Sequence, residues 1–255
     1  MNKMKNLLIY VNPRRDFDEE NKTLIKLQID NSLKLGWRIK DILLVTNFPY
    51  EYSGVKSFVI GDEYYCELFP QATKIDVIVH LFNIGFIKDN ELYWVHDLDA
   101  YQQEIITEQE LDLDNVDIGL TDYGRNNRWN NGSAFIKKEC INLYHLIKKI
   151  MYAEYEDNKG RWKNEEDVLM KLTDGNVNNI NSRIKRLNIT YNFGIKKMKI
   201  CYDKAIKPIK ILHFHPTRIY WNRTTAWDIV KGKNELGFPV INQRLIKLFN
   251  KYGYI

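Results

Sequence analysis

The sequence predicts an α/β fold in a single domain, with a mixed, mostly parallel sheet that helices flank. Short apolar segments alternate with longer segments of helical periodicity, which is the pattern of a doubly wound sheet. Polar and charged residues follow directly after several apolar segments, as they do at the ligand-binding edge of such sheets. The 255 residues contain no internal repeat and no Pro- or Ser-rich linker, so one continuous unit is expected.

The first half of the chain supplies the alternation of strands and helices. A helix is expected over residues 19–35, because Ile25, Ile29 and Leu33 recur every four positions. Residues 72–87 are apolar with mixed periodicity, and we expect mainly helix there. Buried strands lose polar alternation, and the short apolar runs expected to be such strands are residues 6–11, 41–46, 57–60 and 91–95.

In the second half, the clearest element is a helix over residues 139–155, where Leu143, Leu146 and Ile147 follow the helical period. The polar segment 121–131 is expected to be a loop. The remaining elements are expected strands at 116–120, 133–136 and 209–213, a short helix at 165–172 and a terminal helix near 241–249.

The composition, 44% apolar and 28% charged residues, is that of a soluble folded protein. The longest apolar stretch, residues 75–87, contains polar residues and is too short to span a bilayer. The first apolar run is too short for a signal-peptide core. Three widely spaced cysteines exclude a disulfide framework, so we expect a reducing compartment, the cytoplasm.

The net charge of +5 is unevenly distributed. Residues 1–136 carry 14 Lys and Arg against 22 Asp and Glu, a balance of −8, and residues 137–255 carry 24 against 11, a balance of +13. We expect the basic half to contact an anionic acceptor or the cytoplasmic face of an anionic membrane. Nucleic-acid binding by this half is the alternative from a different class, and we favour a solvated face over it.

The strongest candidate metal site is the segment Trp94–Asp99. An apolar strand is expected to end there, and alternate side chains share a face, so Asp97 and Asp99 are placed to hold one hard cation. Two close carboxylates would otherwise raise each other's pKa, which a metal avoids. A turn is the simpler interpretation. The second Asp-x-Asp match, residues 112–114, is expected to be a solvated loop.

Late in the chain, the apolar strand near residue 212 ends in His213-Phe214-His215. Imidazole is a ligand for manganese-like cations, and either histidine could complete a site with the aspartates because both lie on one face. A buried histidine bonded to backbone is the structural alternative.

Three carboxylates, Glu165, Glu166 and Asp167, open the short helix. Helix capping alone could account for them. The functional interpretation is that Glu166 or Asp167 acts as a general base towards an acceptor hydroxyl.

Two further segments suit a sugar nucleotide. Residues 119–133 are rich in Asn and Gly and include Trp129, a composition that binds sugars, although an ordinary hairpin loop also fits. Residues 12–15 follow the first strand and carry Arg14 and Arg15, whose guanidiniums suit a diphosphate. No Gly-x-Gly-x-x-Gly or P-loop motif occurs, which disfavours dinucleotide-binding and P-loop proteins.

In their order, these motifs resemble the GT-A fold of nucleotide-sugar-dependent glycosyltransferases with an Asp-x-Asp motif, a Rossmann-like fold. The resemblance covers about residues 5–218 and rests on motif order. It implies a GT-A domain over residues 1–218, with a donor side of about 1–115 and an acceptor side of about 116–218. Residues 219–255 would form a helical extension packed on the same domain.

The resemblance also implies roles for individual residues. The metal, Mn²⁺ or Mg²⁺, would be held by Asp97, Asp99 and His213. A UDP- or GDP-type sugar donor would contact Val11, Asn12, Arg14, Asp97, Leu98 and Arg218. The acceptor would contact Trp129, Asn131, Gly132 and Ser133. Asp167 would be the catalytic base, with Glu166 close behind.

The implied activity is that of a metal-dependent, hexosyltransferase-like enzyme of glycan biosynthesis. It would move the sugar to a hydroxyl of a glycan or lipid-linked glycan acceptor, with inversion assisted by a carboxylate base. The residues after His213 depart from the Gly and Lys-Pro-Trp of the retaining enzymes known for this histidine. A sugar-nucleotidyltransferase is the alternative enzyme, but residues 12–15 lack the Gly-rich first loop of that class.

Overall fold

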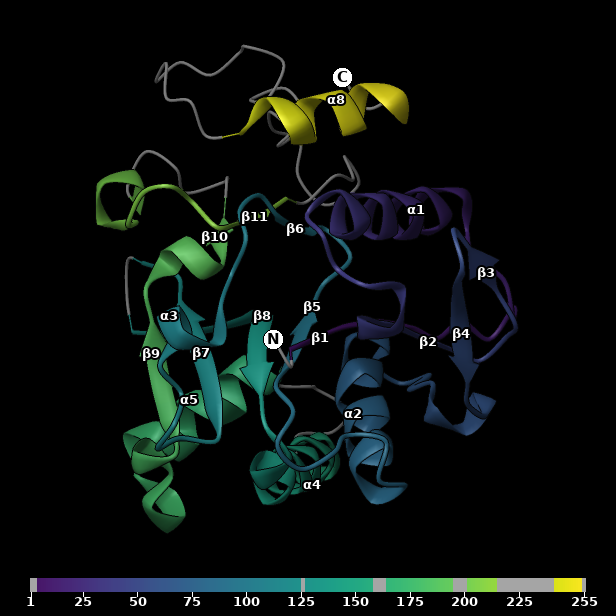
Figure 1. Cartoon of the computed structure of the whole chain (residues 1–255). Coiled ribbons are helices and arrows are strands. Elements are labelled where there is room, and N and C mark those ends of the chain that lie inside the picture. The colour runs from purple at the N-terminus through teal and green to yellow at the C-terminus, as the bar shows by residue number, and fades with distance from the viewer. Residues whose placement is uncertain (1–3, 125–126, 158–163, 195–200, 215–240, 254–255) are drawn as a thin grey trace, which may run out of the picture.

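The computed structural model describes residues 4–124, 127–157, 164–194, 201–214 and 241–253 (Figure 1). Its centre is an eight-stranded sheet of order β3-β4-β2-β1-β5-β8-β7-β9. The neighbours β4, β2, β1 and β5 run parallel, as do β7 and β9, while β8 is antiparallel to both β5 and β7. The strands are β1 Lys5–Tyr10, β2 Ile42–Thr46, β3 Glu51–Tyr52, β4 Val55–Val59, β5 Tyr93–His96, β7 Ile118–Asp122, β8 Trp129–Ile136 and β9 Ile184–Leu187.

Helices cover both faces of this sheet, as the α/β prediction requires. Successive side chains of β1 point to opposite faces: Leu7 belongs to the core that includes α2, α4 and α5, and Leu8 to the core beneath α1. Both leucines are fully buried. The helices are α1 Glu19–Lys34, α2 Thr73–Asn83, α3 Glu108–Leu111, α4 Ile141–Asp157, α5 Glu165–Asp174 and α8 Gln243–Lys251. The predicted fold class is confirmed.

A second sheet of three short strands lies at the end of β5, beneath α8 (Figure 1). Its strands are β10 Phe193–Gly194, β11 Ile211–His213 and β6 Ala100–Gln102. Here β11 pairs antiparallel with β6 and parallel with β10. This small sheet connects the first half of the chain to the last third, because β6 follows β5 directly.

Helix α8 packs against α1 and closes the core of the small sheet. Its apolar side buries Leu245, Leu248 and Phe249 against Tyr101 of β6 and Phe214. Its polar residues hold the end of β6. Arg244 Nη2 donates to the carbonyls of Gln102 and Gln103 at 3.2 and 2.6 Å, and Asn242 Nδ2 donates to the Gln103 carbonyl at 2.8 Å.

Some predicted boundaries differ from the structure. The helix expected over 72–87 ends at Asn83, where Gly85 adopts a φ of +67° that permits the chain to turn. The two ends of the loop expected over 121–131 are strand, because β7 and β8 stay paired to Asp122 and Trp129 across an irregularity after Leu120. The strand expected over 133–136 therefore begins earlier, at Trp129, where its first polar residues are buried by neighbouring elements.

Most of the acidic excess around residues 110–122 is neutralised by the basic half of the chain. The pairs join β7 and its preceding loop to β9 and the segment before β11. They are Glu110–Lys210 (3.3 Å), Asp112–Lys185 (2.5 Å), Asp117–Arg183 (2.6 Å) and Asp122–Arg186 (2.9 Å). In the 112–114 segment, expected to be a solvated loop, both aspartates are exposed but Leu113 is buried in the core. Among the described residues, no helix has the length and apolarity needed to cross a bilayer.

Of the extension predicted over residues 219–255, only residues 241–253 are described. We propose that their helix α8 belongs to the same domain as the rest of the chain, which a Phe249→Ala variant tests. Phe249 is fully buried, and its loss should cost about 3–5 kcal/mol. Thermal unfolding followed by circular dichroism should show one transition at a lower Tm. The control is Lys247→Ala, at an exposed position of the same helix. Two separate transitions, of which only the one with the smaller change in ellipticity moves to a lower Tm, would show that α8 unfolds independently.

Candidate functional site

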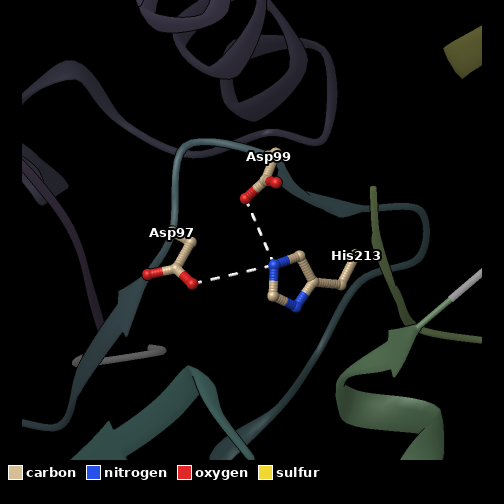
Figure 2. Close-up of side chains that lie close together, drawn as sticks. All are labelled: Asp97, Asp99 and His213. Atoms are coloured by element: carbon tan, nitrogen blue, oxygen red, sulfur yellow. Dashed lines mark ion pairs between the residues drawn. The ribbon is translucent and has the colours of Figure 1, made fainter. Parts of the chain in front are cut away.

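Asp97 and Asp99 lie in the turn that joins β5 to β6, and the pairing of β6 with β11 brings His213 to them. In this ladder His213 is directly opposite Ala100, the residue after Asp99. The turn is held by two backbone hydrogen bonds, from the Ala100 N–H to the Asp97 carbonyl and from the Phe214 N–H to the Asp99 carbonyl. Figure 2 shows the three side chains converging, with both carboxylates facing one nitrogen of the imidazole ring.

The geometry of this group fits a divalent cation. His213 Nε2 lies 3.2 Å from Asp99 Oδ1 and 3.7 Å from Asp97 Oδ2, and one ligand atom from each residue lies within 4.8 Å of the others. The other ring nitrogen, Nδ1, lies 3.1 Å from the side-chain oxygen of Asn192. The Asn192 amide nitrogen donates to the Asn130 carbonyl, so its oxygen faces the ring and Nδ1 carries the proton. Nε2 is therefore the ring nitrogen that faces the carboxylates and that a metal would bind, as in a metal-binding histidine.

Gly132 provides the space for the histidine ring. A Cβ atom at this position would lie 2.2 Å from His213 Cε1 and 3.1 Å from Asp97 Oδ2. Gly132 is on β8, next to β5, and its carbonyl accepts the Asp97 N–H at 3.0 Å. The small residue therefore accommodates the His213 side chain itself.

A lysine on α2 lies beside the proposed metal ligands. Lys74 Nζ donates to Asp97 Oδ1 at 2.7 Å and to the Asn131 carbonyl at 2.9 Å. Burial lowers the pKa of Lys74, but Asp97 and Glu165 raise it by more, so the amine stays charged. For Asp97, burial raises the pKa, while Lys74 and His213 hold it below its usual value.

The same electrostatics act on the two histidines near the turn. Burial lowers the pKa of His213, but the carboxylates of Asp99 and Asp97 raise it above its ordinary value. His96, at the end of β5, is stacked on Trp94, and its Nε2 lies 2.8 Å from Asn6 Oδ1. Burial lowers the pKa of His96 to about 4, so this ring is neutral and serves the core.

Asp97, Asp99, Lys74 and His96 line a cavity of about 800 Å³ at the carboxyl ends of β1 and β5. Among the described residues, its charged lining consists of five carboxylates and one amine: Glu20, Asp97, Asp99, Glu165, Glu166 and Lys74. Such an excess of carboxylates, partly shielded from water, favours a bound cation. The cavity falls in the size range of about 300–1,000 Å³ of pockets that hold small ligands.

Of the two proposed bases, Glu166 lines this cavity and Asp167 does not. Tyr123 donates its hydroxyl to both Glu166 oxygens at 2.9 and 2.8 Å, and the Asn131 N–H donates to Oε1 at 3.1 Å. Burial raises the pKa of Glu166, and these hydrogen bonds lower it in part. Asp167 is 42% exposed at its side chain and pairs with Arg128 at 3.0 Å.

The four residues expected to contact the acceptor are buried, and none of them is among the described residues that line this cavity. Ser133 Oγ accepts from Trp94 Nε1 at 2.8 Å, within the core. The Arg186 guanidinium covers one face of the Trp129 ring, 3.8 Å from its centroid, and Trp129 Nε1 donates to Thr173. Asn131 and Gly132 support Glu166 and His213.

The residues expected to contact the nucleotide lie at the end of β1. Val11 lines the main cavity and an adjoining one of about 760 Å³, which Asn12 and Arg14 also line. The Asn12 N–H donates to Asn47 Oδ1 at 3.0 Å, which fixes this turn against β2. Leu98 lines the main cavity. The alternative metal ligand His215 and the proposed donor residue Arg218 lie outside the described residues.

Sequence reasoning missed Lys74 and Tyr123. Lys74 is the only lysine in the apolar segment 72–87. A lysine in an apolar segment is buried only when it is paired with an acidic group. Lys74 could therefore have been recognised from the sequence as a candidate site residue. Tyr123 gave no such signal, because its contact with Glu166 depends on where the β7–β8 turn lies relative to α5.

A Gly132→Ala variant should weaken metal binding, because its methyl group would displace the His213 ring. We expect the Kd for Mn²⁺, measured by titration calorimetry, to rise at least ten-fold. The control is Gly194→Ala: Gly194 pairs with His213 in the β10–β11 ladder, but its Cβ would meet nothing within 4 Å. Equal Mn²⁺ affinity in both variants would contradict a role of the ring in binding.

Comparison with known proteins supports the fold assignment. No protein-family model and no curated protein matches the sequence. Among solved structures, the chain is similar to a glycosyltransferase involved in glycosylation of the major capsid of PBCV-1, at a TM-score of 0.51 and 12% identity over 82% of this chain and 92% of that one. It is also similar to the glycosyltransferase GlyE of Streptococcus pneumoniae TIGR4, at a TM-score of 0.55 and 15% identity over 98% of this chain.

The chain spans 63% of the GlyE chain it matches. Identities this low establish a common fold and leave substrates to be determined for each protein. The order of the strands, the helices on both faces and the Asp-x-Asp turn after β5 agree with this likeness. The chain therefore has the GT-A fold of glycosyltransferases, with an Asp-x-Asp motif and a histidine placed together as a candidate metal site.

Proposed function

We propose that this protein is a metal-dependent glycosyltransferase that moves a sugar from a nucleoside-diphosphate sugar to a hydroxyl of a glycan. The observation that carries the proposal is the group of Asp97, Asp99 and His213, whose two aspartates line the 800 Å³ cavity. In a GT-A fold this cavity lies at the carboxyl ends of the parallel strands, where open α/β sheets bind ligands.

The charge of the cavity supports a metal-bound diphosphate. Five carboxylates and one lysine line it, so an anionic diphosphate would be repelled unless a cation joined it. The proposed ligand set of two carboxylates and one imidazole suits Mn²⁺ or Mg²⁺. A bound divalent cation would supply Lewis-acid stabilisation of the departing nucleoside diphosphate. We propose a UDP- or GDP-type donor, with its nucleoside towards Val11, Asn12 and Arg14.

Lys74 complements this arrangement. Its ammonium is held between Asp97 and the Asn131 carbonyl and faces the cavity. From there it can donate to a hydroxyl of the donor sugar or to a phosphate oxygen. Glu20 and Asn21 of α1 also line the cavity and offer further partners for hydroxyl groups.

We propose Glu166 as the catalytic carboxylate in preference to Asp167. Its pKa is raised by burial, which suits a base, and Tyr123 holds its orientation. The acceptor oxygen would form a bond to the anomeric carbon, the bond from that carbon to the phosphate oxygen would break, and Glu166 would take the acceptor proton. Inversion at the anomeric carbon is a prediction. NMR of the product tests it, because the spectrum gives the configuration at that carbon.

The other interpretations receive less support. The likeness of the fold to glycosyltransferases does not favour a nucleotidyltransferase or a nucleic-acid-binding protein. Contact with an anionic membrane, a lipid-linked acceptor and a cytoplasmic location stay predictions. Flotation with liposomes that contain or lack anionic lipid tests the first of them.

The proposed function predicts slow hydrolysis of one donor in the presence of Mn²⁺, since transferases leak sugar to water. A screen of nucleoside-diphosphate sugars, read as release of the nucleoside diphosphate, should identify it. Asp99→Asn should lower this rate at least 100-fold and remove the rise in Tm that Mn²⁺ with the diphosphate causes. Asp114→Asn, in the exposed second Asp-x-Asp, is the control. Hydrolysis of no donor by the wild type would contradict the proposal.

The assignment of the base predicts different effects at adjacent positions. Glu166→Gln keeps the size of the side chain and one acceptor oxygen for Tyr123 and the Asn131 N–H but removes the base, and should lower transfer by about 10²–10⁴-fold. Asp167→Asn should lower it less than five-fold, because Asp167 pairs with Arg128 outside the cavity. Transfer is measured with the donor found by the hydrolysis screen. A larger loss in Asp167→Asn than in Glu166→Gln would reverse the assignment.

A further inference from the structure

We propose that a groove along the β7–β9 edge of the sheet binds the glycan chain of the acceptor, on the other side of Tyr123 from the donor cavity. The inference rests on the proposed function and adds to it the place where the acceptor is held. It implies that the natural acceptor is an oligosaccharide, because the groove lies beyond the reacting centre and holds sugars that do not react.

The groove consists of two adjoining cavities of about 580 and 260 Å³. They share two residues, Asn127 and Arg186, and the hydrogen bond from Arg186 Nη1 to the Asn127 carbonyl (3.3 Å) lies where the two cavities adjoin. The first cavity lies over the ends of β7 and β9, and the second continues towards α5. The described residues that define them best are Asp122, Asn127, Arg186, Asn188, Lys204 and Asp174.

The lining has the chemistry of a sugar-binding surface. Arg186 lies flat over Trp129 at 3.8 Å, and its Nη1 donates to Asp122 Oδ2 at 2.9 Å. The stacked guanidinium is therefore a fixed plane, with its outer side 40% exposed at the side chain. Amides, carboxylates and cations around it can donate to and accept from sugar hydroxyls, while Leu187 and Ile189 offer apolar contact for the faces of the rings.

Tyr123 connects this groove to the proposed reacting centre. Its hydroxyl contacts Glu166 and lines the donor cavity, while its neighbours Asp122 and Gly124 line the groove. On the other side, Trp129 Nε1 donates to Thr173 near the end of α5, the helix whose second residue is Glu166. A glycan chain in the groove would thus lie beside Tyr123, the residue that holds Glu166, with its terminal sugar directed towards the donor cavity.

This placement also revises the part of segment 119–133 that meets the acceptor. Asn131 supports the proposed base and Gly132 makes room for the proposed metal ligand His213, whereas Asp122, Gly124 and Asn127 line the groove. Trp129 contributes as the support beneath Arg186, and its own ring face is covered.

The test is an Asn127→Trp variant, which fills the place where the two cavities meet at an exposed position. The control is Asn142→Trp, an exposed asparagine that lines a separate cavity of about 300 Å³ near α4. With the donor found by hydrolysis, malto-, cello-, chito- and galacto-oligosaccharides of one to six units serve as acceptors. Saturation-transfer NMR measures binding of the same sugars to the full chain without donor.

We expect oligosaccharides to be better acceptors than their monosaccharides, and Asn127→Trp to raise their KM at least ten-fold with a smaller effect on kcat. Arg186→Ala should act in the same direction, and Asn142→Trp should match the wild type. Donor hydrolysis is measured in every variant. A wild type that hydrolyses no donor would contradict the proposed function, whereas saturation transfer still tests the groove. Saturation transfer that is absent for every sugar, or equal in wild type and Asn127→Trp, would overturn the inference.

Discussion

The candidate metal site depends on the antiparallel pairing of β6 with β11. Asp97 and Asp99 belong to a turn that any α/β sheet can place at the end of a central strand, but the histidine must come from residue 213. Backbone hydrogen bonds set the register of the two strands and so fix His213 opposite Ala100. The neighbouring β10 adds the second constraint, since Asn192, just before it, holds the imidazole in the tautomer that binds metal.

Next to this pair of strands, the cavity concentrates negative charge, which opposes folding and favours the binding of a cation. Carboxylates that face one another in a partly buried cavity raise the free energy of the folded chain, and one lysine offsets only part of it. A cation and a diphosphate together would neutralise the remainder. This is the usual relation between stability and activity, in which a site built for ligands is less stable without them.

The sequence predicted the features that arise from local pattern. Alternation of apolar runs, the Asp-x-Asp after a strand and three carboxylates at a helix start are all readable from short windows. It failed where tertiary context decides. The polar residues Asn130 and Asn131 hid the start of β8, because Asn131 is satisfied by Glu165 of α5 and the Asn130 carbonyl by Asn192, just before β10. Glu166 and Asp167 look equal in sequence, but only the helix orientation shows which one faces the cavity.

The support of β6 by the end of the chain has a consequence for folding during synthesis. Gln103 is made early, yet its carbonyl is satisfied by Arg244 and Asn242, and β6 gains its only strand partner among the described residues from β11. While the ribosome is still making the second half, this strand has an open edge and Asp97 and Asp99 have no histidine. Non-local contacts of this kind form late and slowly. The nascent chain therefore passes through a period in which its central parallel strands can already assemble but the metal site cannot. During this period the edge of β6 is exposed to chaperones.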